Sequence, residues 1–98
     1  MKLIYITFAF LCLTSCAGKP PFLEYSIAQT ALQAARKVNA EQNTGSYWEK
    51  AISYYQRGKK KFQERDYISA ERFFNESIKW AEKAENLSRF KMSTGEGI

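Results

Sequence analysis

Apolar side chains recur every three or four residues through most of this chain, from Phe22 to Leu87. This spacing places them along one side of an α-helix, whereas a half-buried strand would need them at every second residue. No stretch shows an alternation of period two that is bounded by turn residues. The pattern therefore predicts an all-α fold.

Two interruptions divide the helical pattern into three segments. Residues 39–45 lose the periodicity and end at Gly45, and Asp66 stands directly before the third apolar run. Glycine is typical of a chain reversal, and aspartate is a preferred helix N-cap. We therefore expect helices at about 22–40, 46–64 and 66–91, which form one three-helix domain over residues 22–91 with a flexible tail at 92–98.

Each expected helix carries an apolar face that can form part of a common core. The first face is rich in alanine, so a neighbouring helix can approach closely, and it comprises Ile27, Ala31, Ala34, Ala35 and Val38. The second comprises Trp48, Ala51, Ile52, Tyr55, Gly58 and Phe62, and the third Tyr67, Ala70, Phe74, Ser77, Ile78, Ala81 and Ala84. Ser46 and Glu49 have the spacing of a capping box, and Asp66 is expected to cap the third helix.

The N-terminal segment has a different character. Met1-Lys2 supplies positive charge, and Leu3 to Leu13 is apolar except for Thr7. As a helix this run is roughly 16 Å long, about half of the ~30 Å hydrocarbon core of a bilayer. The run is therefore too short to span a membrane and is typical of a secretory signal peptide.

The sequence Leu13-Thr14-Ser15-Cys16 directly follows this run and resembles the lipobox of bacterial lipoproteins. The resemblance implies that residues 1–15 are a signal peptide, cleaved between Ser15 and Cys16, and that the Cys16 thiol carries acyl chains such as palmitate. Residues 16–21 then form a lipidated tether that ends at a proline pair. The alternatives are a plain secretory signal with an accidental cysteine, or a buried core segment.

The residue after the lipidated cysteine bears on the location of the protein. It is Ala17 and not aspartate, which by resemblance to Gram-negative lipoproteins implies an outer-membrane anchor with the chain facing the periplasm. In a cell with one membrane, the same anchor would hold the protein at the outer face of the cell membrane.

The segment from Tyr55 to Phe74 resembles a tetratricopeptide-type hairpin. Gly58 takes the small position where the helices cross, Asp66-Tyr67 marks the turn, and Phe74 follows at the spacing that this repeat prefers. Lys61 stands where an aromatic residue is usual, and no proline follows near Glu82. Because an array needs about three repeats to bury a continuous core, we expect a lone hairpin.

The chain from Pro20 to Ala84 also resembles the DUF4398-type small periplasmic lipoproteins. The likeness rests on the lipobox, the proline near the mature start, the alanine-rich first helix, Gly58 and the Asp66-Tyr67 turn. It implies a helical envelope lipoprotein, which in some members is joined to peptidoglycan-binding modules of the OmpA type. It supplies no catalytic residues.

The composition argues against an enzyme. The chain has no histidine and two cysteines, of which Cys12 lies in the expected signal peptide and Cys16 would be acylated. A histidine-based triad or a zinc site of histidine and cysteine ligands is therefore excluded, and no metal or other cofactor is expected. Asp66, Glu71 and Glu76 are interpreted as solvated helix charges and not as an acid/base pair.

Two groups of residues are candidates for a binding surface. The basic group is Arg57, Lys59, Lys60, Lys61 and Arg65, in a chain of net charge +5. It suits anionic lipid headgroups or envelope polymers such as peptidoglycan, whereas nucleic acid is disfavoured by the expected location. Successive residues of a helix point about 100° apart, so these cations cannot all face one ligand, and the other interpretation is a solvated face.

The second candidate group is aromatic. Tyr54 and Phe73 each precede another aromatic residue, and since neighbours on a helix diverge, one of each pair is expected at the edge of the core. With Trp80 they form an apolar strip for a protein partner or for self-association.

The sequence thus favours a lipid-anchored, non-enzymatic adaptor or structural module of the envelope. The alternatives are a binder of anionic envelope polymer and a small subunit of a secretion or export complex.

Overall fold

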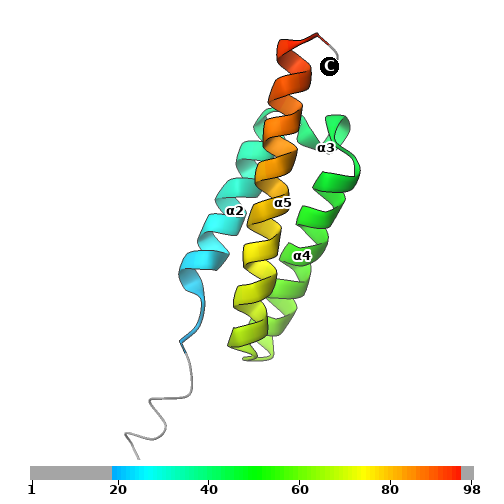
Figure 1. The fold of residues 1–98 in the computed structure, drawn as a ribbon. Coiled ribbons are helices and arrows are strands. Elements are labelled where there is room, and N and C mark those ends of the chain that lie inside the picture. The colour runs from blue at the N-terminus through cyan, green and yellow to red at the C-terminus, as the bar shows by residue number, and fades with distance from the viewer. Residues whose placement is uncertain (1–18, 96–98) are drawn as a thin grey trace, which may run out of the picture.

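The computed structural model describes residues 19–95, and this part of the chain is all-α (Figure 1). Three long helices lie side by side: α2 (Phe22–Lys37), α4 (Ser46–Gln63) and α5 (Tyr67–Ser93). A short helix, α3 (Ala40–Asn43), lies in the connection between α2 and α4. The expected fold class is confirmed, while the expected signal peptide, its cleavage site and Cys16 lie outside the described residues.

Helices α4 and α5 form an antiparallel hairpin whose turn spans residues 64–66. Arg65 adopts a left-handed conformation there, with φ of 63°. The Asp66 side chain accepts a hydrogen bond of 3.3 Å from the Ser69 backbone N–H, which satisfies one free donor at the start of α5. The expected cap of the third helix is therefore confirmed.

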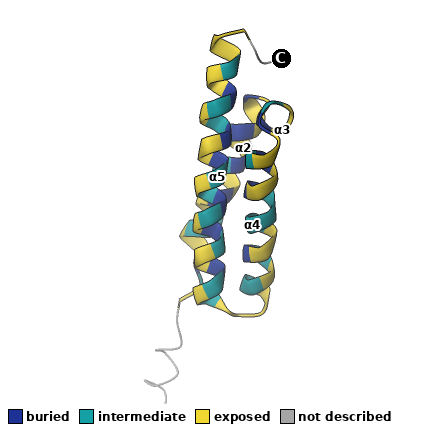
Figure 2. Ribbon diagram, turned by 45° about the vertical axis from the view of Figure 1, so that its right-hand side comes forward, coloured by how far each residue is buried: buried dark blue, intermediate teal, exposed yellow. Residues whose placement is uncertain are grey.

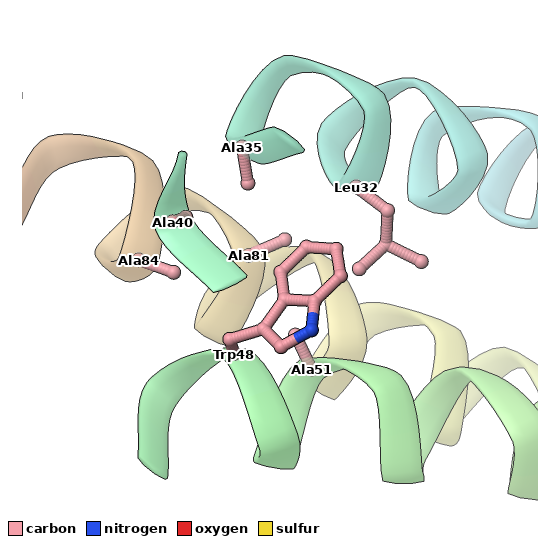
Figure 3. Close-up of a cluster of buried hydrophobic side chains, with 7 residues drawn as sticks. All are labelled: Leu32, Ala35, Ala40, Trp48, Ala51, Ala81 and Ala84. Carbon is pink, nitrogen blue, oxygen red and sulfur yellow. The ribbon is translucent and has the colours of Figure 1, made fainter. Parts of the chain in front are cut away.

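The buried residues lie where the three helices face one another (Figure 2). Most of the buried apolar residues are alanines. Trp48 of α4 is the largest residue in a cluster that also contains Leu32, Ala35, Ala40, Ala51, Ala81 and Ala84 (Figure 3). A second cluster surrounds Phe74 of α5, which is completely buried against Ala28 and Ala70. Alanines bring the helix backbones close, and the few aromatic rings fill the remaining space.

The face of α2 that enters the core differs from the expected one. Ala28, Leu32 and Ala35 are buried, whereas Ile27 is exposed and Ala31 and Ala34 are only half-buried. The helix has apolar residues on two sides, because Leu23 and Ile27 follow one another at helical spacing on its outer side. The expected Ala35 and Val38 are buried. The periodicity of α2 therefore predicted the helix and part of its buried side, but placing Ile27 on that side was wrong.

The connection from α2 to α4 also differs from expectation. Helix α2 ends at Lys37, Asn39 takes a left-handed conformation, and Ala40–Asn43 forms a helical turn where a loop was predicted. At the start of α4 the N-cap is Gly45, and no side-chain cap hydrogen bond forms. The predicted capping box is therefore wrong, because Ser46 already lies inside the helix. At the other end of the domain, α5 continues through Ser93, so helix includes the first residues of the predicted tail.

Buried hydroxyl groups tie α5 to its neighbours. Ser77 Oγ donates a hydrogen bond of 2.7 Å to the Ala51 carbonyl oxygen of α4. Ser88 Oγ donates to the Val38 carbonyl oxygen and accepts from Asn43 Nδ2 at 3.0 Å. The Ser77 bond ties α5 to α4, and the Ser88 bonds fix the α2–α4 connection against the C-terminal half of α5.

Candidate binding surface

The structure brings the three aromatic candidates together on one side of the α4–α5 hairpin. Tyr54 of α4 and Phe73 of α5 stack with ring centroids 6.2 Å apart. Trp80 lies two turns further along α5, and its ring is 5.6 Å from that of Tyr47. All four side chains are half-buried, so part of each ring reaches the surface. We call Tyr47, Tyr54, Phe73 and Trp80 the aromatic row.

The aromatic row lies on the side of the hairpin that α2 does not cover. Tyr55 and Phe74, the sequence neighbours of two row residues, both contact the Tyr25 ring of α2. Since adjacent residues of a helix diverge by about 100°, Tyr54 and Phe73 point away from α2. The expectation that one residue of each aromatic pair lies at the core edge is met for Phe73, because its neighbour Phe74 is completely buried.

Cationic side chains lie over two rings of the aromatic row. The ammonium groups of Lys50, Lys83 and Lys79 lie 4.3, 4.7 and 5.3 Å from the centroid of the Trp80 ring. The Arg57 guanidinium lies 5.5 Å from the Tyr54 centroid. Significant cation–π contacts occur roughly once per 70–80 residues in proteins, so three lysines on one indole is an unusual concentration of charge.

The cluster around Trp80 has more hydrogen-bond donors than acceptors. Lys79 lies 3.9 Å from a Glu76 carboxylate oxygen. Lys50 and Lys83 form no ion pair within residues 19–95. The Trp80 indole Nε1 is buried and has no hydrogen-bond partner in the described part of the chain. The exposed ammonium groups of Lys50 and Lys83 therefore suit a ligand that carries negative charge.

The predicted basic group does not form one patch. Arg57 lies at the aromatic row, whereas Lys59 packs over Tyr55, 5.6 Å from its ring centroid and on the side of α2. Lys61 pairs with Glu64 at 3.4 Å, Lys60 is exposed, and Arg65 lies in the turn. The spread of these cations around α4 agrees with the expectation from helix geometry.

Four members of the surface were not identified from the sequence: Tyr47, Lys50, Lys79 and Lys83. Tyr47, Lys50, Tyr54 and Arg57 follow each other at steps of three and four residues, which places them along one side of α4. That signal was present in the sequence, but each residue separately looks like an ordinary surface position. The pairing of α4 with α5 is what brings the two sets of residues together.

The three carboxylates considered for acid/base chemistry are not gathered at one site. Asp66 accepts a backbone hydrogen bond at the start of α5, Glu76 contacts Lys79, and Glu71 is exposed. Within residues 19–95, no group of three potential metal-ligating side chains occurs.

The chain was compared with models of protein families, with curated proteins and with solved structures, and no match was found. Across residues 19–95, no helix has the length and apolar character needed to cross a bilayer.

Proposed function

We propose that this protein is a lipid-anchored, non-enzymatic adaptor of the bacterial envelope, with the aromatic row as its contact surface for another protein. The observation that carries the proposal is the row itself, four half-buried rings bounded by cations on the uncovered side of the α4–α5 hairpin. Aromatic residues and arginine are enriched in protein interfaces. Tyrosine and tryptophan supply a large contact area at a low cost in side-chain entropy.

The anchor in this proposal is the acylated Cys16, held at the periplasmic face of the outer membrane. It is supported by the short apolar segment and the Leu13-Thr14-Ser15-Cys16 sequence. Two or more acyl chains, each contributing about 0.8 kcal/mol per buried CH₂ group, would hold the protein permanently.

The anchor is tested by a Cys16→Ser variant of the full chain. We expect it to lose the acyl mass and to leave the membrane fraction, whereas the parent chain keeps both. A variant that retains the acyl mass and the membrane location would contradict the anchor.

The contact surface is tested by photo-crosslinking in intact cells. A photoreactive amino acid at Tyr54 should give a discrete protein adduct, identified by mass spectrometry. The same group at Gln29, an exposed residue of α2, is the matched control and should give none. Equal crosslinking from both positions, or from neither, would contradict the adaptor role of this surface.

A second candidate function is binding of an anionic envelope polymer, such as peptidoglycan. The specific observation that favours it is the cluster of Lys50, Lys79 and Lys83 around Trp80, in which only Lys79 forms an ion pair among residues 19–95, with Glu76. Ammonium groups placed this close together repel one another, and a polymer carboxylate or phosphate would relieve that repulsion.

Binding of the polymer is tested by co-sedimentation of the protein with isolated peptidoglycan at increasing salt concentration. A Lys50→Gln, Lys83→Gln double variant should lose most of the salt-sensitive binding. A Lys37→Gln, Arg89→Gln variant removes the same charge at exposed positions elsewhere and should bind like the parent chain. Equal losses in both variants would indicate a nonspecific charge effect and contradict this candidate.

A further inference from the structure

Three large apolar side chains are exposed at one end of the bundle. Phe22 and Leu23, the first residues of α2, are 66% and 67% exposed, and Ile68, the second residue of α5, is 83% exposed. The two helix starts are neighbours in space, because both contact the Phe62 ring of α4. The centroid of that ring lies 5.5 Å from the Phe22 ring centroid and 5.6 Å from that of Tyr67. Figure 1 shows the start of α2 and the α4–α5 turn at the same, lower end of the bundle.

The direction of these side chains follows from helix geometry. In an α-helix the Cα–Cβ bonds tilt toward the helix N-terminus. Helices α2 and α5 both begin at this end, and the three residues lie in their first turns. Phe22, Leu23 and Ile68 therefore lean toward the end of the bundle.

Cations accompany the apolar residues. Lys19, Lys60 and Arg65 are exposed at this end, and none of them forms an ion pair within residues 19–95. Of the carboxylates at the same end, Glu64 pairs with Lys61 and Asp66 caps α5. Glu24, in the first turn of α2, is half-buried and forms no ion pair within residues 19–95. We call Lys19, Phe22, Leu23, Lys60, Arg65 and Ile68 the basal end.

The chain length sets the distance between the basal end and the proposed anchor. Six residue steps separate Cys16 from Phe22 in the sequence, and at about 3.3–3.6 Å per residue they span at most roughly 20 Å. A surface held this close to the bilayer meets it at high effective concentration, so weak contacts suffice for docking.

We propose that the basal end docks on an anionic membrane surface, an inference that rests on the proposed acylation of Cys16. Phe22, Leu23 and Ile68 enter the interface between headgroups and acyl chains, where large apolar side chains are stabilised. Lys60 and Arg65 meet the lipid phosphates. Docking in this way directs the C-terminal end of α5 away from the membrane and leaves the aromatic row accessible from the side.

The test uses the full, acylated chain purified from membranes and reconstituted into vesicles of equimolar phosphatidylglycerol and phosphatidylcholine. An environment-sensitive fluorophore is attached to a single introduced cysteine, in the Leu23→Cys, Ile68→Cys or Phe90→Cys variant. Phe90 is the matched control, because it is 60% exposed but lies near the opposite end of α5. We expect a blue shift and quenching by spin-labelled lipid at positions 23 and 68, and neither at position 90.

The outcomes separate the docking from the anchor. A chain that carries acyl mass and floats with the vesicles, yet shows the same water-exposed fluorescence at all three positions, overturns the docking and leaves the anchor intact. A chain without acyl mass that does not float overturns the anchor, and the docking with it.

Charge variants and neutral vesicles test whether docking of the basal end requires anionic lipid. With the fluorophore at position 68, the Lys60→Gln, Arg65→Gln pair should reduce the blue shift, whereas the Lys37→Gln, Arg89→Gln pair, at exposed positions away from the basal end, should leave it unchanged. Vesicles of phosphatidylcholine alone should reduce the blue shift of the parent chain. An unchanged shift in both the basal variant and the neutral vesicles would contradict recognition of anionic lipid.

Discussion

A β-carbon placed on Gly58 would lie 2.7 Å from two ring carbons of Phe74. Both residues are buried, one near the end of α4 and the other in the first half of α5. The absence of a side chain at Gly58 therefore lets the aromatic ring lie directly against the α4 backbone. This contact sets how closely the two helices of the hairpin approach.

Replacement of Gly58 by alanine is expected to destabilise the protein. Overpacking of a well-packed core costs typically 1–3 kcal/mol. Alanine recovers about 1 kcal/mol, since glycine is a poor helix former. We expect a net loss of about 1 kcal/mol in the free energy of unfolding, measured by urea denaturation.

The coupling between the two residues provides the control for this prediction. In a Phe74→Leu background the ring is gone, so the Gly58→Ala change should be neutral or stabilising. If Gly58→Ala destabilises both backgrounds equally, the Phe74 ring is not the group that excludes a side chain.

The hairpin could be predicted from the sequence because its determinants are local. The close approach of the two helices is specified by Gly58, the start of α5 by Asp66, and the buried side of α5 by its own apolar residues. All three are consistent with the same hairpin. The buried face of α2 could not be predicted in the same way. That helix offers apolar residues on two sides, and only packing against α5 selects Ala28 over Ile27.

The two predicted caps give a matched pair of substitutions. Asp66→Ala removes the side-chain acceptor of the Ser69 N–H and should cost about 1 kcal/mol. Ser46→Ala should change stability by less than about 0.5 kcal/mol, because Ser46 makes no cap hydrogen bond to α4. Thermal unfolding of both variants checks the order, and a larger loss for Ser46→Ala would place the α4 N-cap at Ser46 and not at Gly45.

The candidate surface could be predicted only in part. Tyr54, Phe73, Trp80 and Arg57 were identified because aromatic and basic residues are conspicuous in sequence. Lys50 acquires its significance from a contact between residues that are far apart in the chain, since it lies on α4 and reaches over the Trp80 ring of α5. Such a contact depends on the rotation of α4 against α5, which residue spacing alone does not specify.

Ser88→Ala is expected to loosen the connection between α2 and α4. The Ser88 hydroxyl bonds both the Val38 carbonyl oxygen and Asn43 Nδ2, and its loss leaves these groups without that partner. Unsatisfied buried polar groups cost about 1–3 kcal/mol. We expect faster amide hydrogen exchange across residues 38–45, with less change in the α4–α5 turn.

The comparison variant for this connection is Ser93→Ala, which removes an exposed hydroxyl whose hydrogen bond stays within the last turn of α5. It should leave exchange across residues 38–45 unchanged. Equal acceleration in both variants would show that fraying of α5, and not the Ser88 network, controls the connection.

The Tyr25–Tyr55 pair predicts how stability changes at alkaline pH. Burial raises the pKa of Tyr25 above its ordinary value of 10.0, and the neighbouring Tyr55 raises it further. The folded protein therefore holds this proton at pH values where the unfolded chain has released it. The contribution of Tyr25 to stability is complete below pH 10.0 and is lost as the pH rises from there through the raised pKa.

Tyr25→Phe should consequently show a smaller loss of stability than the parent chain between about pH 9 and pH 11, measured by urea unfolding at each pH. The loss of stability in Tyr55→Phe should lie between those of Tyr25→Phe and the parent chain. This substitution removes one cause of the raised pKa and leaves the burial of Tyr25 in place. The rings pack edge to face with centroids 5.9 Å apart, so phenylalanine preserves the contact in either variant. Identical pH dependence in all three chains would mean that ionisation of Tyr25 is not linked to folding.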